Sequence, residues 1–305
     1  MKNKSILLAI TFFLASTFAF AQDEMFKVLA SKGGNKLQTS GTSDWKPVFV
    51  GKKLTKGDKI TIADNGYLGL AYKNGKTIEL KKAGTYEVNK LASEVASQNA
   101  STTTKYANYL AGEMGKTGGE DMAKNKYKYM AVTGSVERGS GVAIIAPKEV
   151  KAFNNTLTIE WKSEPGAKDY VVEVTNLFGD IVLTKETKDT SMIINLDKKK
   201  ERIYVTKVYL KENQNYVGEI KIEYPSEDKS IELNKEITEL NTQLPENNAL
   251  NKMIFASFYE DNKLFLEALQ SYQTAIKLQP DVDDYKLAYN QFLERSGLLK
   301  PTAEK

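Results

Sequence analysis

The residues that most resemble chemical machinery are two Gly-Lys-Thr tripeptides, at residues 75–77 and 115–117. A phosphate-binding loop needs a further glycine five residues before the glycine of this tripeptide, because backbone N–H groups must surround the phosphate. Leu70 and Leu110 occupy those two positions. We therefore interpret Gly75 as a hairpin turn and the second glycine as the end of a helix.

Three pairs of adjacent acids are the other candidates: Glu120–Asp121, Glu260–Asp261 and Asp283–Asp284. Adjacent side chains point apart on a helix or a strand, so spacing alone makes none of them a two-carboxylate site. The chain has no histidine and no cysteine, which excludes imidazole acid–base chemistry, thiol nucleophiles, disulfides and Cys/His zinc sites.

From this inventory we expect no catalytic residues, no metal ion and no cofactor, and we predict that the protein is not an enzyme. The catalytic alternative is a hydrolase that uses two carboxylates. It requires two acids about 5–10 Å apart in a cleft.

The charge distribution bears on the class of partner. The 305 residues include 43 Lys and Arg against 39 Asp and Glu, for a formal net charge of +4. Proteins that bind nucleic acid usually concentrate a basic excess on one face, whereas these lysines are scattered among acids. The one dense run, Lys198–Lys200, falls where a turn between strands is expected, and we interpret it as solvated. We therefore expect no nucleic-acid partner.

The first 21 residues are typical of a secretory signal peptide. A basic start precedes an apolar run over residues 6–20, which ends in small residues of the A-x-A type. The run is shorter than the ~20 residues of a membrane span. We expect an exported protein of a bacterial envelope, periplasmic or beyond, without a transmembrane helix after cleavage. The cleavage site comprises Ala19, Ala21 and Gln22, with the cut after Ala21.

From residue 25 to residue 91, short alternating apolar runs are separated by turn residues. Residues 64–66 (Asp-Asn-Gly) and 74–75 (Asn-Gly) are strong turn sequences. Strands that recur every 8–12 residues predict a small antiparallel sandwich or roll.

The glycines and apolar residues of this segment also follow a fixed order. A tryptophan precedes the pattern Gly-x-x-Leu-x-x-Gly-Asp-x-Ile, and an Asn-Gly turn follows it. This order resembles the periplasmic FecR-type domain, and it specifies a fold more than a site. Signalling members of that family are joined through a transmembrane helix to a segment that controls a sigma factor. Only the predicted signal peptide precedes the domain here, so we expect a detached envelope module. The motif residues are Trp45, Gly51, Leu54, Gly57, Asp58 and Gly75.

Residues 92–145 are predicted to be a linker that contains a short helix. Residues 93–104 are rich in Ser, Thr, Asn and Gln, which is typical of a linker. Tyr106, Leu110 and Met114 fall on one helical face and predict the helix. Residues 130–136 have the pattern of a strand that returns to the first sheet.

Residues 146–225 show cleaner alternation, with about seven strands, as an immunoglobulin-like sandwich requires. Trp161, the turn at Gly166–Tyr170 and Tyr204 resemble a fibronectin type III domain. Because Trp161 shares its face with Ile159, we predict that it fills the core and does not serve as a sugar-stacking platform. Such a fold serves as a spacer or as a binding module, and the fold alone does not decide which.

Residues 226–300 switch to helical periodicity. Ile231, Ile237, Leu240 and Leu244 predict one helix, and residues 283–295 predict the last. Between them, the spacing of small and aromatic residues resembles a single tetratricopeptide repeat. One repeat cannot bury its own face, so we expect a bundle of about four helices. The repeat residues are Ala256, Tyr259, Ala268, Tyr272, Ala275 and Pro280.

The resemblance to a tetratricopeptide repeat implies a groove that holds a peptide or a partner. The alternatives are a structural cap and a dimerisation surface. Taken together, the segments predict a multidomain chain in which β domains precede a helical domain. We expect a non-enzymatic envelope protein that binds other proteins as a scaffold. The alternative is a protein that binds peptidoglycan or another polysaccharide through exposed aromatic residues such as Trp45.

Overall fold

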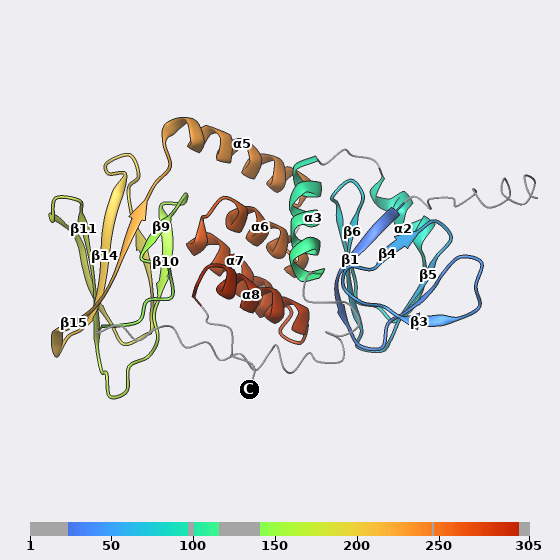
Figure 1. Ribbon diagram of the computed structural model, residues 1–305, viewed down its shortest axis with the longest axis horizontal. Coiled ribbons are helices and arrows are strands. Elements are labelled where there is room, and N and C mark those ends of the chain that lie inside the picture. The colour runs from blue at the N-terminus through green and yellow to red at the C-terminus, as the bar shows by residue number, and fades with distance from the viewer. Residues whose placement is uncertain (1–23, 97–100, 116–140, 246, 299–305) are drawn as a thin grey trace, which may run out of the picture.

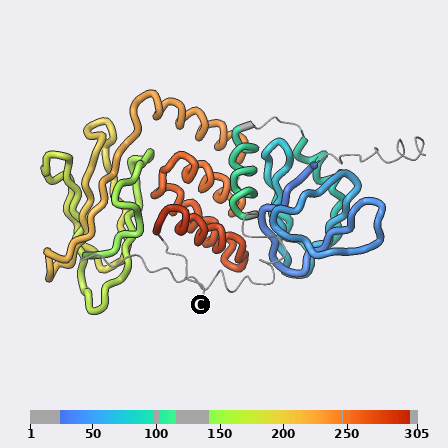
Figure 2. Tube along the Cα trace, viewed as in Figure 1, coloured from blue at the N-terminus to red at the C-terminus, as the bar shows by residue number. Residues whose placement is uncertain are grey.

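The computed structural model describes residues 24–96, 101–115, 141–245 and 247–298. The predicted signal-peptide cleavage site and the predicted strand over residues 130–136 lie outside these ranges. Antiparallel β sheets come first in the chain and four helices come last, which confirms the predicted order of β structure and helices. In space, however, the C-terminal helices lie between the two β parts (Figures 1 and 2).

The N-terminal part consists of two four-stranded antiparallel sheets, with strand orders β4-β1-β6-β7 and β3-β2-β5-β8. Their apolar side chains, among them Phe26, Leu54 and Ile60, form one core. The short helix α2 (Val88–Val95) buries its apolar face in the same core. The strands are β1 (Glu24–Lys32), β2 (Lys36–Gln38), β3 (Trp45–Pro47), β4 (Lys53–Thr55), β5 (Lys59–Ile62), β6 (Tyr67–Tyr72), β7 (Thr77–Leu80) and β8 (Gly84–Glu87).

Apart from Trp45, the residues of the glycine-rich motif occupy turns and core positions of these sheets. Gly51, Gly57 and Gly75 have φ angles of +83°, +88° and +88°, a left-handed conformation that glycine adopts without steric cost. Asp58 is buried, and its carboxylate accepts hydrogen bonds from the backbone N–H groups of Ser40 (2.9 Å) and Thr55 (2.8 Å). The motif therefore fixes the path of the chain.

Helix α3 (Ser101–Gly115) packs against the β6–β7 hairpin. Tyr106, Leu110 and Met114 are buried, as their helical spacing predicts. The prediction of a linker over residues 93–104 is wrong where the structure describes it, because 93–95 belong to α2 and 101–104 to α3. Thr103 is fully buried and donates to Gln243, so tertiary burial overrides the polar composition of this turn.

The second β part contains seven strands in two sheets, with orders β12-β11-β14-β15-β9 and β10-β13. Strand β9 pairs in parallel with β15, and the other pairings are antiparallel. Trp161 is buried in the core between the sheets, which confirms the prediction for this residue. The strands are β9 (Glu149–Lys151), β10 (Thr156–Glu160), β11 (Tyr170–Asn176), β12 (Ile181–Thr187), β13 (Ser191–Asn195), β14 (Ile203–Leu210) and β15 (Asn213–Glu223).

The C-terminal helices are α5 (Glu227–Gln243), α6 (Ala249–Asp261), α7 (Phe265–Leu278) and α8 (Asp283–Arg295). The prediction that Ile231 belongs to the buried face of the first of these helices is wrong, because Ile231 is 63% exposed. Leu233 and Leu240 are the buried residues of α5. At 100° per residue, Ile231 lies about 200° around the helix from Leu233.

Helix α6 is covered on all sides, since every residue from 249 to 260 is buried or half-buried. On one side α3 packs against it, and the rings of Tyr106 and Phe258 meet edge to face at 5.2 Å. The N-terminal sheet adds a hydrogen bond from Leu250 N to the Glu79 carboxylate on β7 (2.9 Å). Helix α7 is its main helical neighbour.

Polar contacts fasten both β parts to the helices. Tyr67 on β6 and Tyr285 on α8 share a buried hydrogen bond of 2.6 Å, and Ser31 N donates to the Asp284 carboxylate (2.7 Å). On the sandwich side, Gln273 on α7 donates to Glu160 on β10 (2.8 Å). The helical layer is therefore held from both faces.

Replacing Gly75 with alanine tests the close approach of the β6–β7 hairpin to α3. A Cβ at Gly75 would overlap the backbone of Thr103 and Thr104, whereas one at Gly51 meets nothing within 4 Å. Both positions have positive φ, so Gly51→Ala is the matched control and should cost about 1–2 kcal/mol. We expect Gly75→Ala to lower the free energy of unfolding by about 1–3 kcal/mol more, measured by chemical denaturation. Equal losses would contradict the described contact.

Candidate functional site

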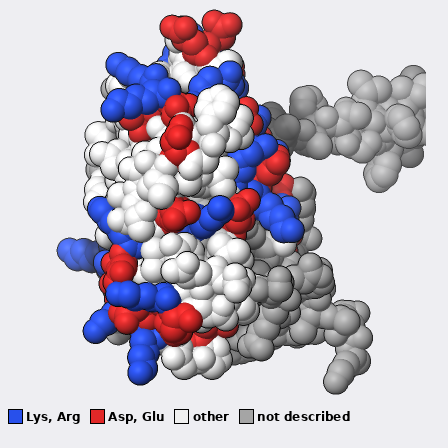
Figure 3. Space-filling model, turned by 90° about the vertical axis from the view of Figure 1, so that its left-hand side faces the viewer, with Lys and Arg blue, Asp and Glu red and all other residues white. Residues whose placement is uncertain are grey.

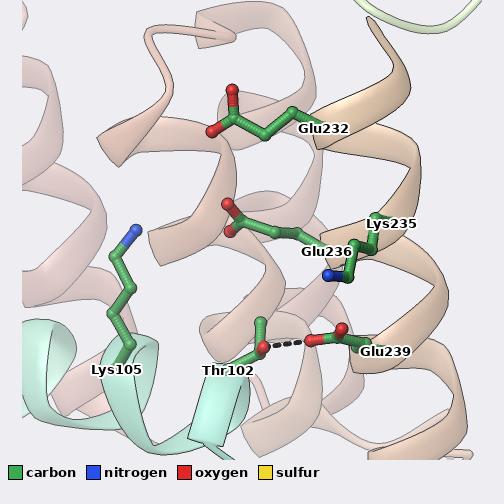
Figure 4. A pocket seen from close by; sticks show the side chains of 6 residues that line it. All are labelled: Thr102, Lys105, Glu232, Lys235, Glu236 and Glu239. Atoms are coloured by element: carbon green, nitrogen blue, oxygen red, sulfur yellow. Dashed lines mark hydrogen bonds between the residues drawn. The ribbon is translucent and has the colours of Figure 1, made fainter. Parts of the chain in front are cut away.

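A hollow of about 350 Å³ lies between α3 and α5. Three acidic side chains, Glu232, Glu236 and Glu239, project into it from α5 (Figure 4). Their spacing of four and three residues places them on one face of the helix. Thr102, Lys105 and Lys235 complete the lining.

The carboxylates of the hollow mainly fasten α5 to α3. The Thr102 hydroxyl donates to Glu239, and the Tyr106 hydroxyl donates to Glu236. Burial, reinforced by Glu236, raises the pKa of Tyr106 to about 12, so its hydroxyl stays protonated at neutral pH. Within the part of the chain that the structure describes, no three acidic groups converge in a way that would hold a metal ion. The arrangement is that of a helix contact, with two of its three carboxylates engaged by hydroxyls.

The adjacent acids that suggested chemistry point apart where the structure describes them. Glu260 faces the interior, while Asp261 pairs with Lys105 at the surface (3.1 Å). Asp284 is bound to Ser31, and Asp283 lies 3.4 Å from the ammonium of Lys286. The third pair, residues 120–121, lies outside the described ranges.

Glu260 is the centre of a buried polar network. The Arg295 guanidinium donates two hydrogen bonds to its carboxylate (2.7 and 3.1 Å). Two tyrosine hydroxyls also donate, from Tyr272 (2.7 Å) and from Tyr109 (3.1 Å). Burial raises the pKa of Tyr272 and the neighbouring Glu260 adds to this shift, which keeps the hydroxyl a donor. The network joins α3, α6, α7 and α8.

The repeat-like residues contribute to the core. Ala256, Ala268 and Ala275 have no exposed surface, and Tyr272 belongs to the Glu260 network. Tyr259 is half-buried and packs against Phe258, and Pro280 is exposed beyond the end of α7. Helix α6, which carries Ala256 and Tyr259, is covered by α3 and the N-terminal sheet. Among the FecR-type motif residues, Trp45 retains an exposed aromatic surface, with 39% of its area accessible.

Four exposed apolar residues at the sandwich end of the molecule were not predicted from the sequence. They are Leu177, Phe178, Ile181 and Val182, at the β11–β12 hairpin, and Phe178 is 85% exposed. Figure 3 looks onto this end, where uncharged surface lies among charged side chains of both signs. The signal in the sequence was a Leu-Phe pair directly before a turn glycine, where polar residues are usual.

The turn that carries Phe178 is fixed by hydrogen bonds. The Asn176 side-chain oxygen accepts from the backbone N–H groups of Phe178 (3.0 Å) and Asp180 (2.9 Å). The backbone N–H of Asn176 donates to the carbonyl of Asp180 (3.0 Å), and its side-chain amide donates to the Asp180 carboxylate (2.9 Å). Phe178 is therefore presented to solvent by a turn that several hydrogen bonds hold in place.

Among the described helices, none is both long and apolar enough to cross a bilayer.

Comparisons with known proteins do not place the chain in a family. No protein-family model and no curated protein matches the sequence. One solved structure with a partial match is the complex of Porphyromonas gingivalis RgpB pro- and mature domains (17% identity, TM-score 0.22). Another is the crystal structure of the Arg-specific cysteine proteinase gingipain R (18% identity, TM-score 0.21). Both matches cover 28% of this chain and less than a fifth of the other chain, 19% and 18% respectively. A likeness this limited establishes neither a fold nor an activity.

Substitution of Arg295 tests the buried network. In Arg295→Met the Glu260 carboxylate stays buried without its cation, and we expect a loss of about 3 kcal/mol in unfolding free energy, at the low end for buried pairs. The low end applies because 29% of the Arg295 side-chain surface remains accessible to solvent. The matched control is Arg202→Met, which breaks an exposed pair with Glu223 (3.7 Å) and should cost at most about 1 kcal/mol. Both variants are compared by thermal and denaturant unfolding. If Arg295→Met and Arg202→Met lower the unfolding free energy equally, the structural role of Arg295 is contradicted.

Proposed function

We propose that this protein is an exported, non-enzymatic scaffold that docks another protein of the bacterial envelope at the β11–β12 hairpin. The observation that carries this proposal is the exposure of Phe178 on a turn that hydrogen bonds hold in place. Contiguous exposed apolar side chains are uncommon on soluble proteins and mark interaction sites. A backbone that is already held in place loses little further entropy on binding, which favours affinity.

Side chains, and not the backbone, would provide the recognition. Strand β12 is an edge of its sheet, so its backbone is open to pairing with a further strand. Its pairing with β11 is irregular between Val174 and Thr175, opposite residues 181–183. An irregularity of this kind bends the strand and hinders addition of another strand. The exposed Phe178, Leu177 and Ile181 then suit an apolar pocket on a partner.

The layered architecture supports the role of a scaffold. The sandwich and strand β3 lie at opposite ends of the molecule (Figure 1), and the helices between them are fastened to both β parts. Trp45 on β3 and Phe178 on the hairpin are therefore presented far apart on one body. Two of the three carboxylates of the α3–α5 hollow are engaged in helix contacts, which favours a non-enzymatic role.

The docking proposal predicts that Phe178→Ser abolishes recovery of the partner without changing stability. Phe178 is exposed, so we expect a change within about 0.5 kcal/mol in unfolding free energy. Ile193→Ser is the matched control, since Ile193 is 65% exposed on β13, away from the hairpin. A photo-crosslinking residue at position 178 should capture a discrete protein in cells, and one at position 193 should not. Identical capture by both positions, or none by either, would argue against the hairpin as the docking site.

Polysaccharide binding is the second candidate, and the exposure of Trp45 favours it. The strand that carries this residue is exposed throughout, so the indole ring is accessible for stacking on a sugar. The measurement is the fraction of the protein that sediments with insoluble peptidoglycan. We expect Trp45→Ala to remove most of this fraction and Trp45→Phe to retain part of it, because phenylalanine keeps an aromatic face. Sedimentation that is unchanged in Trp45→Ala would exclude this site.

A further inference from the structure

The Glu267 carboxyl is a buried acid between α7 and the sandwich. One of its oxygens accepts hydrogen bonds from the backbone N–H groups of Phe153 (2.7 Å) and Asn154 (3.0 Å), in the segment between β9 and β10. Its other oxygen, Oε2, is buried and has no hydrogen-bond partner among the described residues. This side chain thus joins two parts of the molecule while half of its carboxyl is unsatisfied.

The charged and titratable groups around Glu267 come from three elements. Lys198, in the β13–β14 loop, places its ammonium 4.3 Å from the centre of the Phe153 ring and donates to the Phe153 carbonyl (2.7 Å). Tyr224, after β15, and Tyr259, on α6, also lie within electrostatic reach of Glu267. Lys198 is the one cation of this set. Although it belongs to the run predicted to be solvated, its side chain is half-buried.

Burial disfavours the ionised form of Glu267, because a buried carboxylate with an unbonded oxygen loses its hydration. Burial raises the pKa of Glu267, and the two backbone N–H groups and Lys198 offset only part of this shift. In the opened or unfolded chain the group ionises at an ordinary pKa of about 4.3. At a pH between the ordinary pKa and the raised pKa, the Glu267 carboxyl is protonated while it is buried and ionised once it is exposed. The contact between α7 and the segment after β9 therefore weakens as pH rises.

We propose that the protonated Glu267 carboxyl is a pH-sensitive latch, which holds the backbone of Phe153 and Asn154 against α7 and releases it when the carboxyl ionises. The latch lies at the joint between the sandwich and the helical layer. Its operation does not depend on the docking role proposed for the hairpin.

Hydrogen exchange of the full chain across a pH series tests the latch. Protection factors, in which the intrinsic effect of pH on exchange is divided out, should fall for the amides of Phe153 and Asn154 as pH rises. We expect a fall of up to about tenfold per pH unit within the titration window. The internal reference is the Ala152 amide, which donates to the Glu223 carbonyl (3.1 Å) and not to Glu267.

Two variants separate the latch from general loosening. Glu267→Gln keeps an oxygen that accepts the two N–H groups but cannot ionise, so its protection factors should stay flat with pH. Lys198→Met removes the cation that favours ionisation and keeps the apolar stem over Phe153, so its fall should move to higher pH. A flat profile in the wild type, or the same decline in Glu267→Gln, would overturn the proposal. If Glu267→Gln does not fold, Lys198→Met is the deciding variant. The proposal is then overturned if the protection factors fall at the same pH in Lys198→Met as in the wild type.

Discussion

The exclusion of water from helix α6 is the constraint on which the rest of the structure depends. Its apolar side chains point in several directions around the helix axis and are fully buried, as Leu250, Ala256 and Phe258 show. A helix that is apolar on all sides is stable only inside a core. The other C-terminal helices do not enclose it alone, and α3 and the N-terminal sheet complete the cover. The need to cover α6 therefore brings α3 against it, and Tyr106 meets Phe258 although the two residues are far apart in the sequence.

Buried polar groups then select one way of docking these parts. A buried hydrogen-bonding group that loses its partner costs about 1–3 kcal/mol, so alternative arrangements of the layers are penalised. Glu260 needs donors from α3, α7 and α8 at once, and Tyr67 needs the hydroxyl of Tyr285. Apolar contact supplies most of the attraction between the layers, while these bonds fix their relative position.

The motifs with family resemblance and the surface suited to binding do not coincide. The repeat-like alanines and the FecR-type turn glycines determine how the chain folds, and most of them are enclosed or lie in turns. The proposed recognition of a partner needs accessible surface, and Phe178 on the sandwich is exposed. The helix that carries the repeat-like residues is covered by α3 and the N-terminal sheet.

The sequence by itself determined the local elements, because periods of 2 and 3.6 residues and turn glycines are properties of short segments. The last helix over residues 283–295, the seven strands of the sandwich and the burial of Trp161 were all predictable in this way. Tertiary structure alone decided that the helices lie between the β parts, that residues 101–104 are helical and that Ile231 faces solvent. These features depend on which surfaces meet, and contacts between residues more than a hundred positions apart leave no periodic signal in the chain.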